Sequence, residues 1–181
     1  SLTLICSDLC LKDIYNKVSQ YDKMDLYNKD YLDKIQLKIK TINHGESLQL
    51  NNYTIKAIHC MHDERIGAQL YLIKYNGKSL LYATDTPQIT ELALQELSNE
   101  KIDCIFLDES FGLCDYSFSH LNIKGFDDYI KTLKQNDLLN ANCLICATHM
   151  THDGNPLHTE LETILGEYGY KPSYDGLEFE L

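Results

Sequence analysis

The spacing of apolar and polar positions divides this chain into short extended segments and longer helical ones. Alternating or nearly continuous apolar runs predict β-strands, and apolar positions that recur at helical spacing predict helices. On this basis the predicted strands are residues 2–6, 35–42, 46–50, 53–58, 70–75, 79–83, 103–107, 143–148 and 179–181. The predicted helices are residues 9–18, 89–97, 123–133 and 157–168, and residues 21–33 form a surface connection or a second short helix.

The turn residues indicate how these segments connect. Asn76-Gly77 separates two predicted strands and predicts a hairpin, because both central residues of a type I′ turn need positive φ. Gly169 is placed to end the last helix. The early half is therefore antiparallel, whereas strands and helices alternate in the later half. This predicts an α/β (α+β) fold in which two sheets lie between helices, a four-layer αββα arrangement, although a single mixed sheet is nearly as compatible.

Length and composition are those of an ordinary globular chain. A chain of 181 residues suits one domain, residues 1–181, and 44% of the residues are hydrophobic while 24% are charged. No run approaches the roughly 18 apolar residues that span a bilayer, so no membrane partner is expected. Residues 1–6 are apolar but short, and we interpret them as a buried strand rather than a signal peptide.

Charge and cysteine content indicate which partners and which cellular compartment suit this protein. The formal net charge of -11 argues against a broad electrostatic footprint for nucleic acid, although bound metal ions can bring positive charge to a phosphate. Seven cysteines, an odd number, do not suit a secreted disulfide framework and favour a reduced, cytoplasmic protein. Cys143 and Cys146 have CxxC spacing, but their flanks favour a buried strand over a redox turn.

Asp85 is the strongest single candidate for chemistry. It follows the apolar strand 79–83, whose end should deliver it to the rim of a site, and the flanking Thr84 and Thr86 can hold its oxygens in place. Its carboxylate could bridge two cations, which a histidine nitrogen cannot do. The alternative is a turn aspartate that helps to cap the helix that follows.

Three further stretches place histidines after strands or before a helix. His149 ends the apolar strand 143–148, and His59 and His62 both follow the strand 53–58 and compete for one role. His120 precedes a helix and could donate a proton to a leaving oxygen. Each also has a structural alternative, as a turn, capping or buried histidine. His152 and His158 complete a histidine-rich segment, and His158 is expected at the surface.

In this order and spacing the motifs resemble the metallo-β-lactamase superfamily, and within it the phosphodiesterase and tRNA 3′-end nuclease branch. The likeness covers roughly residues 53–181, with weaker support for residues 1–42. The matching motifs are His62, Ala83-Thr84-Asp85-Thr86, Leu107-Asp108-Glu109, Ser119-His120-Leu121, Thr148-His149 and Tyr174-Asp175-Gly176.

The resemblance implies an αββα sandwich that holds two divalent metal ions. Asp85 would bridge the ions, His62 would bind one and His149 the other, with His59 as the substitute for His62. His120 would match the family's proton donor, and Asp108 a nearby supporting carboxylate. Zinc is the first expectation, with manganese or iron as alternatives. The implied substrate is a phosphodiester, either a small molecule or a nucleic acid.

One departure from the family pattern is large. The family motif His-x-His-x-Asp-His occurs nowhere, and no histidine precedes His44. We therefore expect a C-terminal portion of the fold, incomplete at the N-terminus, which alone binds metal weakly or not at all and is inactive. An exposed sheet edge and apolar face would favour a homo-oligomer. The competing hypothesis is a non-catalytic α/β binding or scaffold module with structural histidines.

Overall fold

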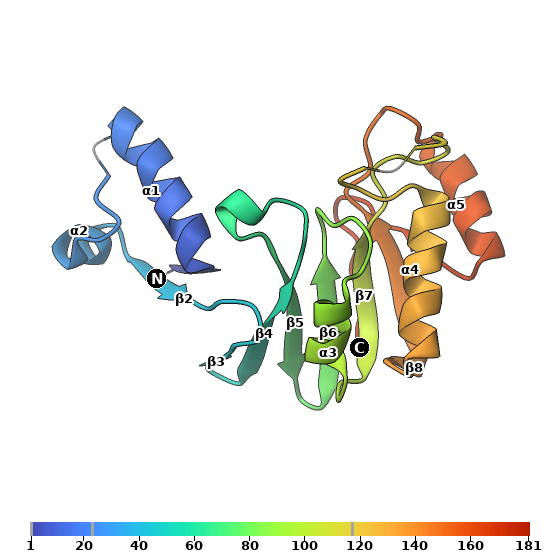
Figure 1. Cartoon of the computed structure of the whole chain (residues 1–181), viewed down its shortest axis with the longest axis horizontal. Helices are drawn as coiled ribbons and strands as arrows, with labels where there is room; N and C mark the ends of the chain where they lie inside the picture. Colours follow the sequence, from blue (N-terminus) through green and yellow to red (C-terminus); the bar gives the residue numbers. More distant parts are fainter. Residues whose placement is uncertain (1, 23, 117) are drawn as a thin grey trace.

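The computed structural model describes residues 2–22, 24–116 and 118–181 and contains a large sheet and a small one (Figure 1). The large sheet has seven strands in the order β3-β4-β5-β6-β7-β8-β9, and the small sheet pairs β1 with β2. The strands of the two sheets are β1 (Leu2–Cys6), β2 (Leu37–Thr41), β3 (Ser47–Leu50), β4 (Tyr53–His59), β5 (Gln69–Tyr75), β6 (Lys78–Ala83), β7 (Ile102–Asp108), β8 (Leu139–Thr148) and β9 (Lys171–Pro172). The helices are α1 (Asp8–Asp22), α2 (Lys29–Lys34), α3 (Glu91–Leu97), α4 (Ile123–Gln135) and α5 (His158–Glu167), with a 3-10 turn at Glu64–Ile66. Among these helices, none is long and apolar enough to cross a membrane.

The large sheet changes direction halfway, as the sequence predicts. Strands β3 to β6 pair antiparallel, and β6 to β9 pair parallel with α3, α4 and α5 as the connections. The β5–β6 hairpin turns at Asn76 and Gly77, whose φ angles are 49° and 75°. Both values lie in the left-handed region that the turn requires. The parallel half matters for function, because its strands all end at one edge.

The main core lies between the large sheet and the helices α3, α4 and α5. Alternate residues of the strands, such as Leu81 on β6 and Leu107 on β7, are fully buried, as are Phe126 and Leu133 of α4. Fully burying one such side chain contributes about 1.5 to 3 kcal/mol, so this face dominates the stability of the fold. The same packing fixes the strands that carry the candidate site.

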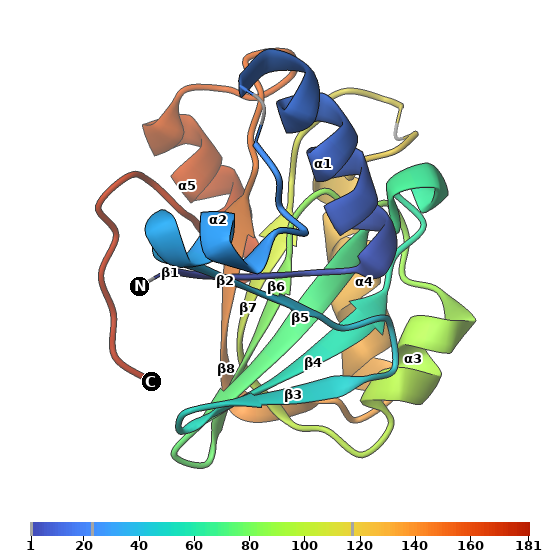
Figure 2. The ribbon, with the colours of Figure 1, turned by 90° about the vertical axis from the view of Figure 1, so that its left-hand side faces the viewer.

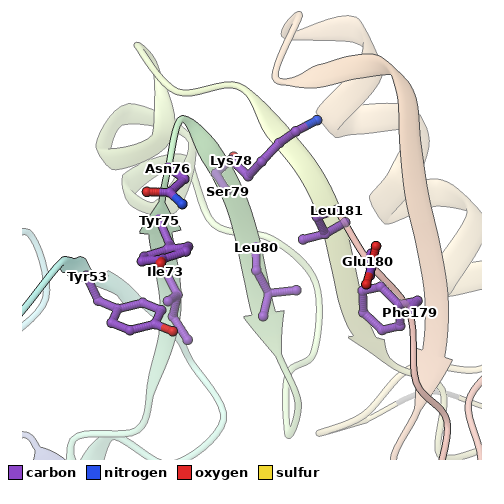
Figure 3. Close-up of a pocket in the computed structure, with 10 residues that line it drawn as sticks. All are labelled: Tyr53, Ile73, Tyr75, Asn76, Lys78, Ser79, Leu80, Phe179, Glu180 and Leu181. Carbon is purple, nitrogen blue, oxygen red and sulfur yellow. The ribbon is translucent and has the colours of Figure 1, made fainter.

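The opposite face of the large sheet is only partly covered. Leu80 and Ile73, which alternate with the buried positions, line an open groove of about 560 Å³ together with Tyr53 and Tyr75. Figure 3 shows these side chains facing the C-terminal residues, and Phe179 packs against Phe106 with ring centroids 5.6 Å apart. Tyr75 and Tyr53 stack across neighbouring strands, with centroids 4.7 Å apart. The groove is therefore apolar and aromatic.

The small sheet forms a separate layer with its own core. Cys6, Leu11 and Leu26 are buried in a cluster of β1, α1 and the segment after it, distinct from the main core. In Figure 1 this part lies at the left-hand end of the molecule, away from α4 and α5, and in Figure 2 it faces the viewer in front of the large sheet. Ser7 ties it to the rest, because its Oγ donates to the carbonyl oxygen of Gly67 at 2.9 Å.

Two predictions about the ends of the chain need correction, and three residues lie outside the described part of the chain. The prediction of a strand at residues 179–181 is wrong, because these residues form no strand. The last strand is β9, which pairs with β8. Residues 2–6 do form a strand, but it is not buried: Leu2 is 72% exposed and only Cys6 is buried. Ser1, in the apolar segment 1–6, Lys23, in the connection 21–33, and Ser117 lie outside the described residues.

Candidate metal centre

The candidate site lies at the edge where the parallel strands end. Asp85 follows β6, Asp108 is the last residue of β7, and His149 follows β8. These three strands are neighbours and run parallel, so their carboxyl ends deliver the side chains to one place. His62 enters from the loop between β4 and β5, and His120 from the segment before α4.

Two of these residues have an unusual backbone conformation. Asp85 has a φ of 51° and His149 a φ of 63°. Positive φ occurs in only a few per cent of non-glycine residues, and it is several-fold enriched for aspartate and histidine. Such outliers cluster at functional sites, where surrounding structure holds them in place. Here the turn out of each strand bends the candidate side chain across the sheet edge.

Two imidazoles face the carboxylate of Asp85. Its Oδ1 lies 3.0 Å from Nε2 of His149 and 3.8 Å from Nε2 of His62. Nδ1 of His62 lies 3.0 Å from the carbonyl oxygen of Ser119, which can only accept, so this nitrogen is the donor. Nε2 of neutral His62 therefore presents a lone pair toward Asp85. Ligand atoms about 2.1 Å from one ion lie about 3.0 to 3.4 Å apart. The separation between Asp85 and His149 therefore suits a shared divalent cation, and the 3.8 Å separation between Asp85 and His62 lies just beyond this range.

Asp108 is the buried anchor of the site. Its carboxylate is fully buried and accepts hydrogen bonds from the backbone N–H groups of Thr86 (3.2 Å), Ser110 (3.0 Å) and Leu121 (3.2 Å). The Oγ of Ser110 lies 3.0 Å away, and Nδ1 of His120 lies 2.7 Å away. Asp108 thus joins the segments after β6 and β7 to the segment before α4. Because these donors occupy its oxygens, it suits a supporting role better than that of a ligand.

His120 lies between the other two imidazoles. Its ring stacks on that of His149, with centroids 5.2 Å apart and planes at 15°, and its centroid is 4.7 Å from that of His62. The short contact with Asp108 fixes the orientation of the ring. Ligand atoms of Asp85, Asp108, His120 and His149 all lie within 4.8 Å of one another, close enough to hold a metal ion, and this group differs from the expected ligand set because it contains His120 and Asp108 and not His62.

The site is open to solvent on one side. The side chain of Asp85 is 51% exposed and that of His149 37% exposed. A surface cavity of about 610 Å³ lies beside His149 and is lined in part by Tyr82, Phe106 and Tyr174. A small molecule therefore has access to the exposed side of His149.

One buried acid and one buried thiol near the site have raised pKa values, which favour their neutral forms. Burial, reinforced by the adjacent Asp108, raises the pKa of Glu109 to about 8. Burial also raises the pKa of the Cys60 thiol, whose Sγ lies 3.5 Å from the backbone oxygen of Asp85. A protonated thiol is a poor metal ligand, so Cys60 is a packing neighbour of the site.

The structure brings together all five residues singled out from the sequence: His62, Asp85, Asp108, His120 and His149. It does not bring in the substitute His59, whose Nδ1 lies 3.0 Å from Oγ1 of Thr90 and whose ring packs against His44. His158, at the start of α5, packs edge-on against Tyr174. Cys143 and Cys146 lie on β8, and burial raises the pKa of both thiols, that of Cys143 to about 12.

The sequence did not single out Ser110, which contacts both Asp108 and His149. The only signal for it is its position two residues beyond Asp108, where a hydroxyl can fold back on a preceding carboxylate. Nor did the sequence reveal that a backbone carbonyl orients His62.

Comparison with family models and with curated protein sequences gives no match. Solved structures do match the fold. A diphosphatase of the PhnP family matches 100% of this chain over 60% of its own length, with 20% identity and a TM-score of 0.67. Zn²⁺-bound PqqB from Methylobacterium extorquens matches 99% of this chain over 62% of its own, with 16% identity and a TM-score of 0.65. The metallo-β-lactamase fold protein YhfI from Bacillus subtilis matches 99% over 65%, with 14% identity and a TM-score of 0.64.

This chain therefore has the metallo-β-lactamase fold, which confirms the predicted fold class. It spans about 60 to 65% of the length of these three proteins. At 14 to 20% identity the likeness establishes the fold.

Proposed function

We propose that this chain carries part of the active site of a metal-dependent hydrolase that cleaves phosphodiesters. The observation that carries the proposal is the convergence of His62 and His149 on Asp85, with the His120–Asp108 pair beside them. Imidazole nitrogen and carboxylate oxygen are ligands for zinc, manganese and iron, and zinc is our first choice. The diphosphatase among the similar structures supports phosphate chemistry.

In this proposal His62, Asp85 and His149 hold the cation. When bound, a divalent ion supplies a hydroxide-generating and charge-stabilising centre for hydrolysis at neutral pH. Asp85 offers a second oxygen, so it can also contact a second ion in a whole protein that provides the further ligands. This chain offers three ligands for one ion, and we expect its own metal binding to be weak and its activity low.

His120 would act on the leaving group. Asp108 lies 2.7 Å from Nδ1 and orients the ring, so Nε2 is the nitrogen that would pass a proton to the leaving oxygen. The stacking of His120 on His149 keeps the His120 ring beside the proposed metal ligands. General acid catalysis of this kind contributes a factor of about 10² to 10⁴.

The experiment that tests this function uses Asp85→Ala in the whole protein. Removal of the carboxylate should lower metal-dependent hydrolysis of bis-p-nitrophenyl phosphate by more than about 100-fold, because loss of even an outer partner of a metal ligand costs about 10 to 100-fold. Zinc and manganese content, measured by mass spectrometry, should fall with it. Asp33→Ala, at an exposed position on α2, is the matched control and should leave both unchanged. Full activity in Asp85→Ala would refute the metal-binding role.

The same measurement separates the enzyme from a binding or scaffold module. A whole protein that contains no metal and whose stability does not change with zinc would favour the module. We also propose a reducing, cytoplasmic location: the described chain contains seven cysteines, and all seven thiols are free.

A further inference from the structure

Ser110 lies fully buried at the centre of the site and contacts three acceptor or donor groups at once. Its Oγ is 3.0 Å from Oδ1 of Asp108, 2.9 Å from the backbone oxygen of His149 and 2.7 Å from Nδ1 of the same histidine. A hydroxyl has one proton and two lone pairs, so it can donate to only one of these neighbours. The direction in which it donates determines which nitrogen of His149 carries a proton.

Two oxygen acceptors decide that direction. Oδ1 of Asp108, which already accepts from two backbone N–H groups, and the backbone oxygen of His149 both face the hydroxyl of Ser110, and neither can donate. If the hydroxyl donated to Nδ1 of His149, both of these oxygen contacts, at 3.0 Å and 2.9 Å, would lack a proton. If the hydroxyl donates to either oxygen, only one oxygen contact lacks a proton, because Nδ1 of His149 then donates to Oγ.

We propose that Ser110 is a positioning residue that connects Asp108 to His149, keeps the ring proton on Nδ1 and so turns the bare Nε2 toward Asp85. The hydrogen-bond chain runs from Nδ1–H of His149 to Oγ of Ser110, and from its O–H to Asp108. This inference rests on the proposed role of His149 as a metal ligand. A partner that fixes the tautomer of a ligating histidine raises metal affinity by about 10 to 100-fold.

Asp85 must be removed to isolate the effect of Ser110 on the tautomer. In the metal-free protein, Oδ1 of Asp85 at 3.0 Å can itself accept a proton from Nε2 of His149, which opposes the proposed tautomer. In Asp85→Ala, Nε2 of His149 loses this acceptor, whereas Nδ1 still faces the hydroxyl of Ser110. The tautomer of His149 in that variant therefore reports on Ser110 and Asp108.

The first test is ¹⁵N NMR of protein labelled at its histidine rings, with a chelator, at about pH 8, where imidazole is neutral. The His149 signals are assigned by their loss in His149→Gln. In Asp85→Ala we expect the proton on Nδ1, and in Asp85→Ala/Ser110→Ala we expect this preference to disappear. A proton found on Nε2 in Asp85→Ala would overturn the proposal, and this result does not depend on whether Ser110→Ala folds.

The second test measures zinc affinity by competition with a chromophoric chelator. We expect Ser110→Ala to weaken binding by about 10 to 100-fold and Ser110→Thr, which keeps the hydroxyl, to restore it. Ser98→Ala, at the exposed end of α3, is the control for the loss of a serine hydroxyl. Unchanged affinity in Ser110→Ala would contradict the proposal. A wild-type protein that binds no zinc, while Asp85→Ala keeps the proton on Nδ1, would refute the proposed function but support the role of Ser110.

Discussion

Asp108 shows how one buried carboxylate can organise several parts of a site. Its carboxylate accepts hydrogen bonds from the backbone N–H groups of Thr86, Ser110 and Leu121. These residues lie in the loops after β6 and β7 and in the segment before α4. Through its contact with His120 it also orients an imidazole. A buried carboxylate is costly without partners, so the position requires all of these donors together. The geometry of the candidate site therefore depends on a residue that is fully buried.

Glu109 beside it should make stability depend on pH. Its pKa rises from an ordinary value near 4.5 to about 8 on folding, mainly through burial. Between these values the folded protein keeps a proton that the unfolded chain has lost, so stability falls as pH rises through this range. We predict that Glu109→Gln, measured with a chelator, equals the wild type at pH 4.5 and exceeds it at pH 8. Since each unit of pKa difference is worth about 1.4 kcal/mol, the gain at pH 8 should be a few kcal/mol.

Urea unfolding at several pH values measures this difference. Glu162→Gln, on the exposed side of α5, is the control and should show the same stability as the wild type at each pH. A constant gap between Glu109→Gln and the wild type across the range would show that burial does not perturb this carboxyl.

At the residue scale, the position of a residue relative to a strand end predicts whether it lies in the site, but the sequence does not predict which side chains contact each other there. Asp85 and His149 could be predicted because each lies within two residues of the end of an apolar strand, and neighbouring parallel strands end together. The choice of His62 over His59 depends on the path of the loop beyond β4, which no local pattern encodes. Ser110 was missed for the same reason, since its partner His149 lies 39 residues away along the chain.

At the scale of helices and strands, local signals predicted most of the large sheet. The Asn76-Gly77 turn, the alternation along β5 and β6 and the end of α5 at Gly169 (φ 80°) all match the structure. The strand predicted at residues 179–181 failed because its apolar residues lie over the open sheet face, where Phe179 contacts Phe106. Such tertiary contacts satisfy an apolar residue without a strand partner.

The start of α4 holds His120 near Asp108, and we predict a measurable stability loss when its cap is removed. Asn122 accepts from the backbone N–H of Gly125 at 2.8 Å, and its Nδ2 donates to the carbonyl oxygen of Cys114. Asn122→Ala should lower the free energy of unfolding by about 1 to 2 kcal/mol. Thermal or urea denaturation measures this. Asn28→Ala, at the cap of the short exposed helix α2, should cost clearly less, and equal costs would contradict a special role for the α4 cap.

At the scale of the whole molecule, the open face of the large sheet is an exposed apolar surface. Tyr82 is 46% exposed on this face, next to Leu80 and Phe106. Contiguous apolar patches of this kind favour association with another surface. The sequence predicts an exposed apolar face, and the structure places one on the open side of β5, β6 and β7.

We predict that this chain self-associates through that face. Sedimentation velocity should show a mass that rises with concentration, and Tyr82→Glu should weaken the association by at least about tenfold, or about 1.4 kcal/mol. Leu92→Glu, which changes an exposed apolar residue on α3, should have little effect. A monomer at every concentration would contradict this prediction.

The origin of the ligands in three separate loops has a mechanical consequence. His62, Asp85 and His149 follow β4, β6 and β8, whose ends can otherwise fray independently. A cation held by all three would fasten these ends to one another across the width of the sheet. When a divalent metal ion is added, amide hydrogen exchange should therefore slow most at this edge of the sheet and least at the hairpin of Asn76 and Gly77, at the opposite edge.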